Sequence, residues 1–150
     1  MGSIAVLSLL AVLLFSVSRN YVGPREYIES LAVTKLSFEN YEMNLFIADT
    51  PVKKARGLSY VPELAQDTGM LFIFLEPSIQ GFWMKDMYIS LDIIWLDAQY
   101  MIVDMHEHVT PETYPDIFSP ETPAQYVIEI PAGKARELLL ERGDVLPLGL

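Results

Sequence analysis

The sequence predicts an α+β domain built on a mainly antiparallel, barrel-like curved sheet of seven or eight short strands with two short helices, preceded by an apolar N-terminal helix. Three observations lead to this prediction. The chain has 150 residues, a length that favours a single domain. Short apolar or alternating runs recur along it, separated by Gly, Pro, Asn and Asp. Hydrophobic residues make up 51% of the chain, more than a disordered protein carries.

The chain begins with an uncharged apolar segment. Residues 4–17 are apolar apart from Ser8 and Ser16, which is the length and character of a secretory h-region. We therefore expect residues 1–18 to be a signal peptide or a transmembrane anchor that contacts the membrane. The protein is then exported, periplasmic or extracellular. Residues 19–30 are expected to form a linker, and residues 31–150 a single globular domain.

Eight runs have the length and pattern of strands. Alternation and continuous apolar runs of four to eight residues favour strands over helices, and Pro77 is expected to end the third strand. The expected strands cover residues 31–38, 42–48, 70–75, 82–84, 91–96, 100–109, 125–130 and 145–148.

Two helices are expected between these strands. Asp49, Thr50 and Pro51 form a helix-start signal, after which a short basic helix over residues 52–56 is ended by Gly57. A second helix is expected over residues 132–142. Residues 110–124 hold four prolines and are expected to form a long, functional loop.

Polar residues in apolar surroundings are the first candidates for chemistry. Lys85, Asp86 and Asp92 follow or interrupt strongly apolar runs, and Trp83 is next to them. A buried charge must be paired or must line a cleft that water reaches. These residues could bind a polar ligand, act as acid and base, or form a structural ion pair of Lys85 with Asp86 or Asp92.

A metal site is a weaker candidate. Strand alternation would place Asp104, His106 and His108 on one face, where two imidazoles and a carboxylate could bind zinc. These are the only two histidines in the chain, so no third one could complete the site. An exposed polar strand face is the alternative, and we expect no metal and no other cofactor.

Composition excludes several classes of function. The chain has no cysteine, so it has no disulfide, no thiolate metal site and no thiol nucleophile. It has 20 acidic against 10 basic residues and a formal net charge of −10, which argues against nucleic acid as a partner. The sequence contains neither the serine-nucleophile motifs nor the Gly-rich phosphate-binding motifs. We expect a monomer.

Several segments, in this order, resemble the family catalogued as domain of unknown function 192. They include Gly69-Met70-Leu71-Phe72, Phe82-Trp83-Met84-Lys85 and Leu91-Asp92-Ile93-Ile94, and the resemblance covers roughly residues 31–148. It implies a small domain of curved sheet plus helices, often behind a signal peptide or anchor, with no established activity. Members usually have arginine where Val61 stands and asparagine where Asp86 stands.

Three functional hypotheses follow. In the first, an extracytoplasmic binding or accessory domain holds a small polar ligand or a peptide between the Phe82–Lys85 turn, Asp92 and the 110–124 loop. Lys85 supplies charge, Asp92 orients it, and Glu129 is peripheral. In the second, Asp86 and Asp92 form the carboxylate pair of a hydrolase, for example one acting on sugars. In the third, the whole motif is structural.

Overall fold

The computed structural model describes residues 22–150, and its contacts divide the chain between Ser30 and Leu31. The expected N-terminal apolar helix, signal peptide or anchor lies outside the described residues. Within residues 22–150, no helix is long and apolar enough to cross a membrane. The first unit is described only from Val22, and it contains the helix α2 (Pro24–Glu29) where a linker is expected. Pro24 stands in the first turn of α2, where a missing N–H costs nothing.

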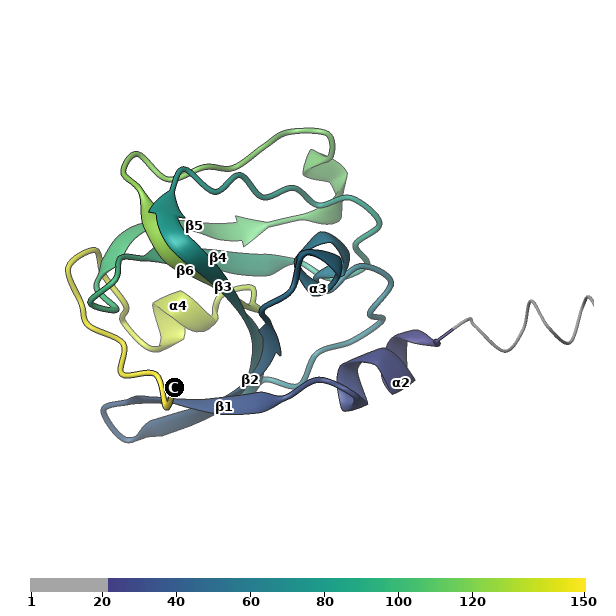
Figure 1. Ribbon diagram of the computed structural model, residues 1–150, viewed down its shortest axis with the longest axis horizontal. Coiled ribbons are helices and arrows are strands. Elements are labelled where there is room, and N and C mark those ends of the chain that lie inside the picture. Colours follow the sequence, from purple (N-terminus) through teal and green to yellow (C-terminus); the bar gives the residue numbers. More distant parts are fainter. Residues whose placement is uncertain (1–21) are drawn as a thin grey trace, which may run out of the picture. The chain divides into compact units, whose positions relative to one another are not determined.

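The second unit is a six-stranded open sheet with two short helices of its own, α3 (Pro51–Arg56) and α4 (Lys134–Glu137) (Figure 1). Its spatial order is β1-β2-β3-β6-β4-β5. The bounds are β1 (Val33–Phe38), β2 (Tyr41–Ala48), β3 (Thr68–Ser78), β4 (Leu91–Leu96), β5 (Ile102–Val109) and β6 (Ala124–Pro131).

The prediction of an α+β domain is confirmed. The finer prediction of a mainly antiparallel, barrel-like sheet holds only in part, because four of the five strand pairings are antiparallel but the sheet is mixed and open. The sheet is mixed because β2 and β3 run parallel, with Leu45 beside Gly69. The connection through α3 and residues 57–67 carries the chain back to the start of β3, as a parallel pair requires. The sheet is not closed, because β1 and β5 are its two edges.

Two of the eight expected strands do not form. Within the described residues, Phe82 makes a single bridge with Phe118, and residues 145–148 make only the bridges Met101–Val145 and Leu36–Leu148. Pro147 has no N–H to donate, which prevents a continuous ladder at the C-terminus. The expected helix over residues 132–142 is also shorter, because Leu139 has a φ of +55° and turns the chain so that Leu140 is buried.

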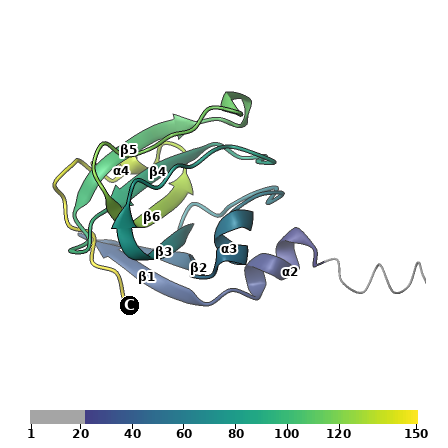
Figure 2. The same ribbon diagram turned by 45° about the horizontal axis from the view of Figure 1, so that its top comes forward.

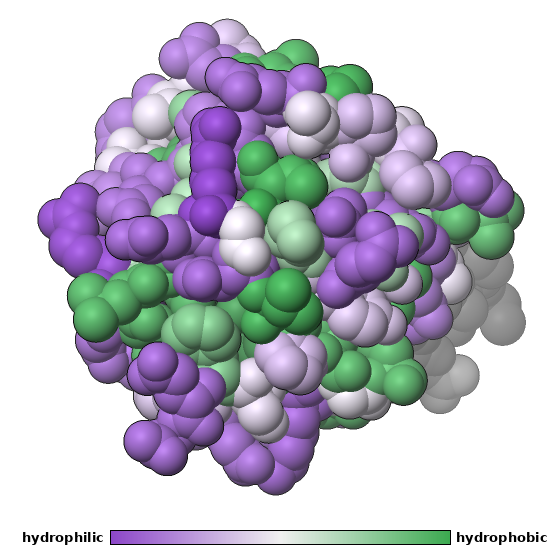
Figure 3. Space-filling model, turned by 90° about the vertical axis from the view of Figure 1, so that its left-hand side faces the viewer, coloured by the Kyte–Doolittle hydropathy of each residue, from purple (hydrophilic) through white to green (hydrophobic). Residues whose placement is uncertain are grey.

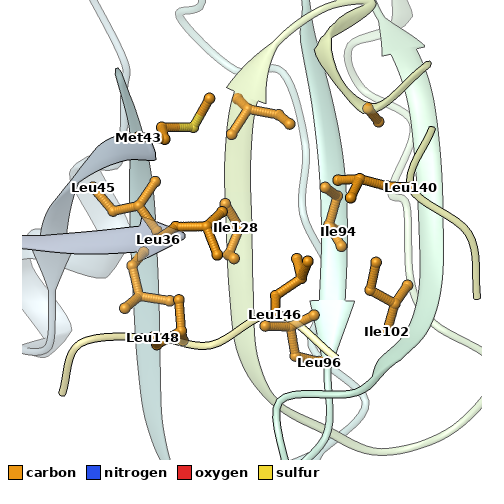
Figure 4. Close-up of a cluster of buried hydrophobic side chains, with 13 residues drawn as sticks. Leu36, Met43, Leu45, Ile94, Leu96, Ile102, Ile128, Leu140, Leu146 and Leu148 are labelled. Atoms are coloured by element: carbon orange, nitrogen blue, oxygen red, sulfur yellow. The ribbon is translucent and has the colours of Figure 1, made fainter. Parts of the chain in front are cut away.

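One face of the sheet packs against α4 and the C-terminal segment. Leu140, Leu146 and Leu148 lie against side chains of β1, β6 and β4, among them Leu36, Ile128 and Ile94 (Figure 4). Both ribbon views show α3 and α4 apart, with strands between them (Figures 1 and 2). On the surface shown in Figure 3, hydrophobic residues lie in patches between hydrophilic ones, as is usual for globular domains.

Gly69 allows β3 to lie close to its neighbours, and we expect Gly69→Ala to lower the free energy of unfolding by about 1–3 kcal/mol. A Cβ atom there would lie 2.6 Å from the carbonyl oxygen of Glu129 and 2.9 Å from side-chain atoms of Ile130 and Leu45. Backbone atoms would have to move to make room. Urea unfolding measures the effect.

Gly23→Ala is the matched control, because a Cβ at Gly23 meets nothing within 4 Å. Equal stability of the two variants would contradict the close approach at Gly69.

Candidate functional site

The second face of the sheet carries a cavity of about 340 Å³. It is lined by the end of α3, by β3, by the segment 80–83, by Met87 and by Glu129 of β6. Phe82 helps to build it, since its ring meets Phe72 at 4.8 Å and Trp95 at 6.0 Å between centroids. Trp95 is buried and donates a hydrogen bond from Nε1 to the carbonyl oxygen of Gln80, which fixes the start of this segment.

Glu129 is the buried acid of this cavity. Its side chain lies beside Met70 of β3 and Ile93 of β4, and only 5% of the residue is exposed. Among the described residues, no hydrogen-bond partner reaches its Oε2 atom. Burial raises the pKa of the Glu129 carboxyl to about 8, because an apolar environment disfavours the charged form. With this pKa, Glu129 is mostly in the protonated, neutral form at pH 7.

The short helix α3 provides the positive charge. Lys54 and Arg56 both line the cavity. The N-cap of α3 is Thr50, whose hydroxyl accepts a hydrogen bond from the Lys53 amide. The Lys54 ammonium donates to the carbonyl oxygen of Ile73 at 2.8 Å and lies 4.5 Å from the centre of the Phe74 ring. No carboxylate among residues 22–150 lies within ion-pairing distance of Lys54 Nζ.

Asp92 lies on the other face of the sheet, the face that packs against α4. It is fully buried and accepts hydrogen bonds from the amides of His108 (2.8 Å), Gly133 (3.1 Å) and Ala135 (2.9 Å). These bonds tie β4 to β5 and to the first turn of α4. Asp92 stands next to Ile93, the β4 residue that pairs with Glu129 of β6, so the two acids point to opposite faces of the sheet. Asp92 and Asp86 therefore do not form the open carboxylate pair that a hydrolase needs.

Trp83 is half exposed, lines the cavity, and meets the Tyr114 ring edge-on at 6.0 Å. Lys85 lies outside the cavity lining, with its ammonium 5.8 Å from the centre of the Trp83 ring. No ion pair joins Lys85 to Asp86 or Asp92 in the described part of the chain. The structure thus brings Trp83 and Glu129 together and leaves Lys85, Asp86 and Asp92 outside.

His106 and His108 do not lie on one strand face. A bulge between β4 and β5 adds a residue, and His108 adopts a φ of +56° there. The His106 ring packs edge-on between Trp95 and Phe118. Nowhere in residues 22–150 do three or more His, Asp or Glu side chains come together in a group that could hold a metal ion. Asp104 instead pairs with Arg142.

The two departures from the family pattern lie outside the cavity. Val61 is buried, and neither Val61 nor Asp86 contributes to the lining. Asp86 has a φ of +58°, and its carbonyl oxygen accepts a hydrogen bond from the Tyr60 amide. Asparagine and aspartate tolerate this left-handed conformation better than other non-glycine residues, which explains why either can occupy the position.

We therefore expect Asp86→Asn to change the free energy of unfolding by less than about 0.5 kcal/mol, and Asp86→Val to lower it by about 1–2 kcal/mol. The reason is that a β-branched side chain crowds the left-handed backbone. Chemical denaturation measures both values. Lys85→Val is the control at a neighbouring exposed position without positive φ, and an equally large loss there would contradict a conformational role for Asp86.

Sequence reasoning did not identify the α3 side of the cavity. Lys54 and Arg56 were expected only as parts of a short basic helix. One signal was present: three of the ten basic residues of this acidic chain, Lys53, Lys54 and Arg56, fall within α3. The other was Glu129, a charged residue between Ile128 and Ile130 in an apolar strand.

A family model and several curated relatives match most of this chain. A family model described as "DUF192: Uncharacterized ACR, COG1430" matches residues 33–148. A UPF0127 protein of Thermococcus gammatolerans is 34% identical over 105 residues, which cover 67% of this chain and 63% of that relative. A UPF0127 protein of Pyrococcus horikoshii is 33% identical over 111 residues, 70% of this chain and 87% of the relative. The match thus spans less than two thirds of the Thermococcus relative.

Two solved structures share the fold. One is a crystal structure from Sinorhizobium meliloti, described as a candidate transcription regulator, with a TM-score of 0.74 and 30% identity. The match covers 79% of this chain and 95% of the Sinorhizobium chain. The other is a protein of unknown function from Novosphingobium aromaticivorans, with a TM-score of 0.69 and 24% identity over 78% of this chain and 84% of that one.

Proposed function

The chain belongs to the uncharacterised DUF192 family, and from this premise we propose that its domain is a ligand-binding module whose cavity beside α3 takes a small organic molecule. The observation that carries the proposal is Glu129, a buried acid that lines the cavity and whose Oε2 atom lacks a partner in the described chain. Leaving a buried polar atom unsatisfied costs free energy, and a ligand that hydrogen-bonds to it recovers that cost.

The shape and lining of the cavity agree with this role. Its volume of about 340 Å³ lies at the lower end of the roughly 300–1,000 Å³ range of small-molecule sites. The aromatic rings of the lining can pack against the apolar part of a ligand, and a few polar groups can fix the orientation of that ligand. These rings belong to Phe72, Phe74, Phe82 and Trp83. The ligand is therefore a compact molecule with an apolar body and a polar end.

A thermal-shift screen of the full chain with neutral, cationic and anionic fragments tests the proposal. A fragment that binds only the folded protein must raise the melting temperature. Ala55→Phe places a ring at the cavity lining from an exposed position of α3, and we expect it to abolish the shifts without unfolding the domain. Ala98→Phe, in an exposed turn away from the cavity, is the matched control. Shifts that survive Ala55→Phe, or a screen without any shift, would refute the proposal.

We do not propose a role in transcription for this chain, although the Sinorhizobium protein is described as a candidate transcription regulator. Phosphate contacts depend on Lys and Arg, and this chain has a net charge of −10.

An exported or membrane-anchored location is a second proposal. It rests on the uncharged apolar run of residues 4–17. A C-terminal reporter fusion tests it: protease access in intact cells supports export, and protection of the reporter refutes it.

A further inference from the structure

We propose that the ligand of this cavity is an organic anion, which Lys54 attracts by charge and to which Glu129 donates a hydrogen bond as a carboxylic acid. This inference rests on the proposed function and names the class of molecule that the site takes. The shared chemistry is an anionic oxygen, of a carboxylate or of a phosphate ester, on an apolar body.

The charges of the lining select an anion. Lys54 and Arg56 of α3 are its cations, and Glu129 is its single acid. A protonated amine in this cavity would meet two like charges, and Glu129 would have to ionise in an apolar environment to offset them. An anion meets attraction from α3 instead, and Glu129 can stay protonated.

Lys54 is placed to take part. It is half-buried, and its hydrogen bond to the carbonyl oxygen of Ile73 uses one of its three donors. Alongside the hydrogen bond from Lys53, its charge lowers the pKa of the Asp49 carboxyl from a distance, but no carboxylate in the described chain forms an ion pair with Lys54, although the protein as a whole has twice as many acidic as basic residues. A partly desolvated cation without a carboxylate partner, on the wall of a cavity, is suited to an anionic guest.

Glu129 supplies the complementary donor. A carboxylic acid has one O–H to donate, whereas a carboxylate can only accept and would repel an anion. Lys54 and Arg56 of α3 are the other titratable groups of the lining. The remaining elements add none: β3 contributes Phe72 and Phe74, and segment 80–87 contributes Gln80, Gly81, Phe82, Trp83 and Met87. Because the Glu129 carboxyl of the protein without ligand has a pKa of about 8, the protonated form, which can donate a hydrogen bond to the anion, dominates at pH 7.

The test uses four probes of similar size on the full chain, measured by calorimetry: benzoate, phenyl phosphate, benzamide and benzylammonium. We expect benzoate, phenyl phosphate or both to bind at least tenfold more tightly than the neutral and cationic probes. A preference between the two anions identifies which anionic group the site takes, and either preference supports the inference. Lys54→Met is expected to weaken anion binding about tenfold, whereas Lys35→Met, at an exposed ion pair with Glu42, leaves it unchanged.

The proton requirement gives a second readout. If only protonated Glu129 binds, the affinity of wild-type protein for the anion falls about tenfold between pH 7 and pH 9. Glu129→Gln keeps a hydrogen-bond donor, so we expect it to bind the anion with an affinity that does not change over this range.

Other outcomes overturn the inference. Preferential binding of benzamide or benzylammonium would show a ligand site of another class and would leave the proposed function standing. Anion binding that is insensitive to both Lys54→Met and pH would refute the two roles assigned here. If none of the four probes binds, the anion inference is refuted. The proposed function is refuted as well only if no fragment of the broader thermal-shift screen binds.

Discussion

Asp92→Ala is expected to lower the free energy of unfolding by about 3–5 kcal/mol. The carboxylate is fully buried and accepts three backbone amide hydrogen bonds, from His108 in β5 and from Gly133 and Ala135 at α4. Removing it leaves three amide donors without an acceptor. Since a domain of this size is stable by roughly 5–15 kcal/mol, the variant loses a large part of its stability.

Asp92→Asn gives an intermediate result that identifies the mechanism. The amide oxygen can still accept from His108 and Gly133 where Oδ1 does, but its NH₂ group faces the Ala135 amide, where Oδ2 accepts now. We expect a loss of about 2 kcal/mol by urea unfolding.

Asp116→Ala, which removes an exposed carboxylate, should have little effect and serves as the control. A loss below about 1 kcal/mol for Asp92→Ala, combined with loss of ligand binding, would contradict the structural role and return Asp92 to the site.

The sequence was most informative where local chemistry decides structure. Thr50, Pro51 and Gly57 predicted the start and end of α3, because capping and chain stiffness act within a few residues. Most strands were also predicted, because the alternation and the length of an apolar run are local features of the sequence. The parallel pairing of β2 with β3 was not, because a strand's own pattern does not determine the direction of its neighbour.

The site was predicted only in part for a related reason. A buried polar residue is visible in the sequence, but its partners depend on which face of the sheet it occupies. Asp92 and Glu129 both stand in apolar strands, yet three amides surround one, while Oε2 of the other lacks a partner in the described chain. The bulge at His108 separates two side chains that simple alternation places together.

The stability of the domain is expected to fall between about pH 4.5 and pH 8 because of Glu129, and Glu129→Gln should remove this dependence. The carboxyl has an ordinary pKa of 4.5 in the unfolded chain and a pKa of about 8 when folded. Below pH 4.5 both states are protonated. Between the two values the unfolded chain releases a proton that the folded domain keeps, so rising pH favours unfolding until the effect levels off above pH 8.

The size of the effect follows from the shift. Each unit of pKa corresponds to about 1.4 kcal/mol, so Glu129 costs the wild-type domain on the order of 4–5 kcal/mol at pH 8 relative to pH 4. Urea unfolding of wild type and Glu129→Gln at pH 5, 6, 7 and 8 measures the difference, and subtraction cancels groups that titrate alike in both proteins. Glu63→Gln, at an exposed acid, should follow the wild-type curve. A difference that stays constant from pH 5 to pH 8 would mean that Glu129 ionises as readily in the folded domain as in water, and it could not then act as the hydrogen-bond donor to an anion.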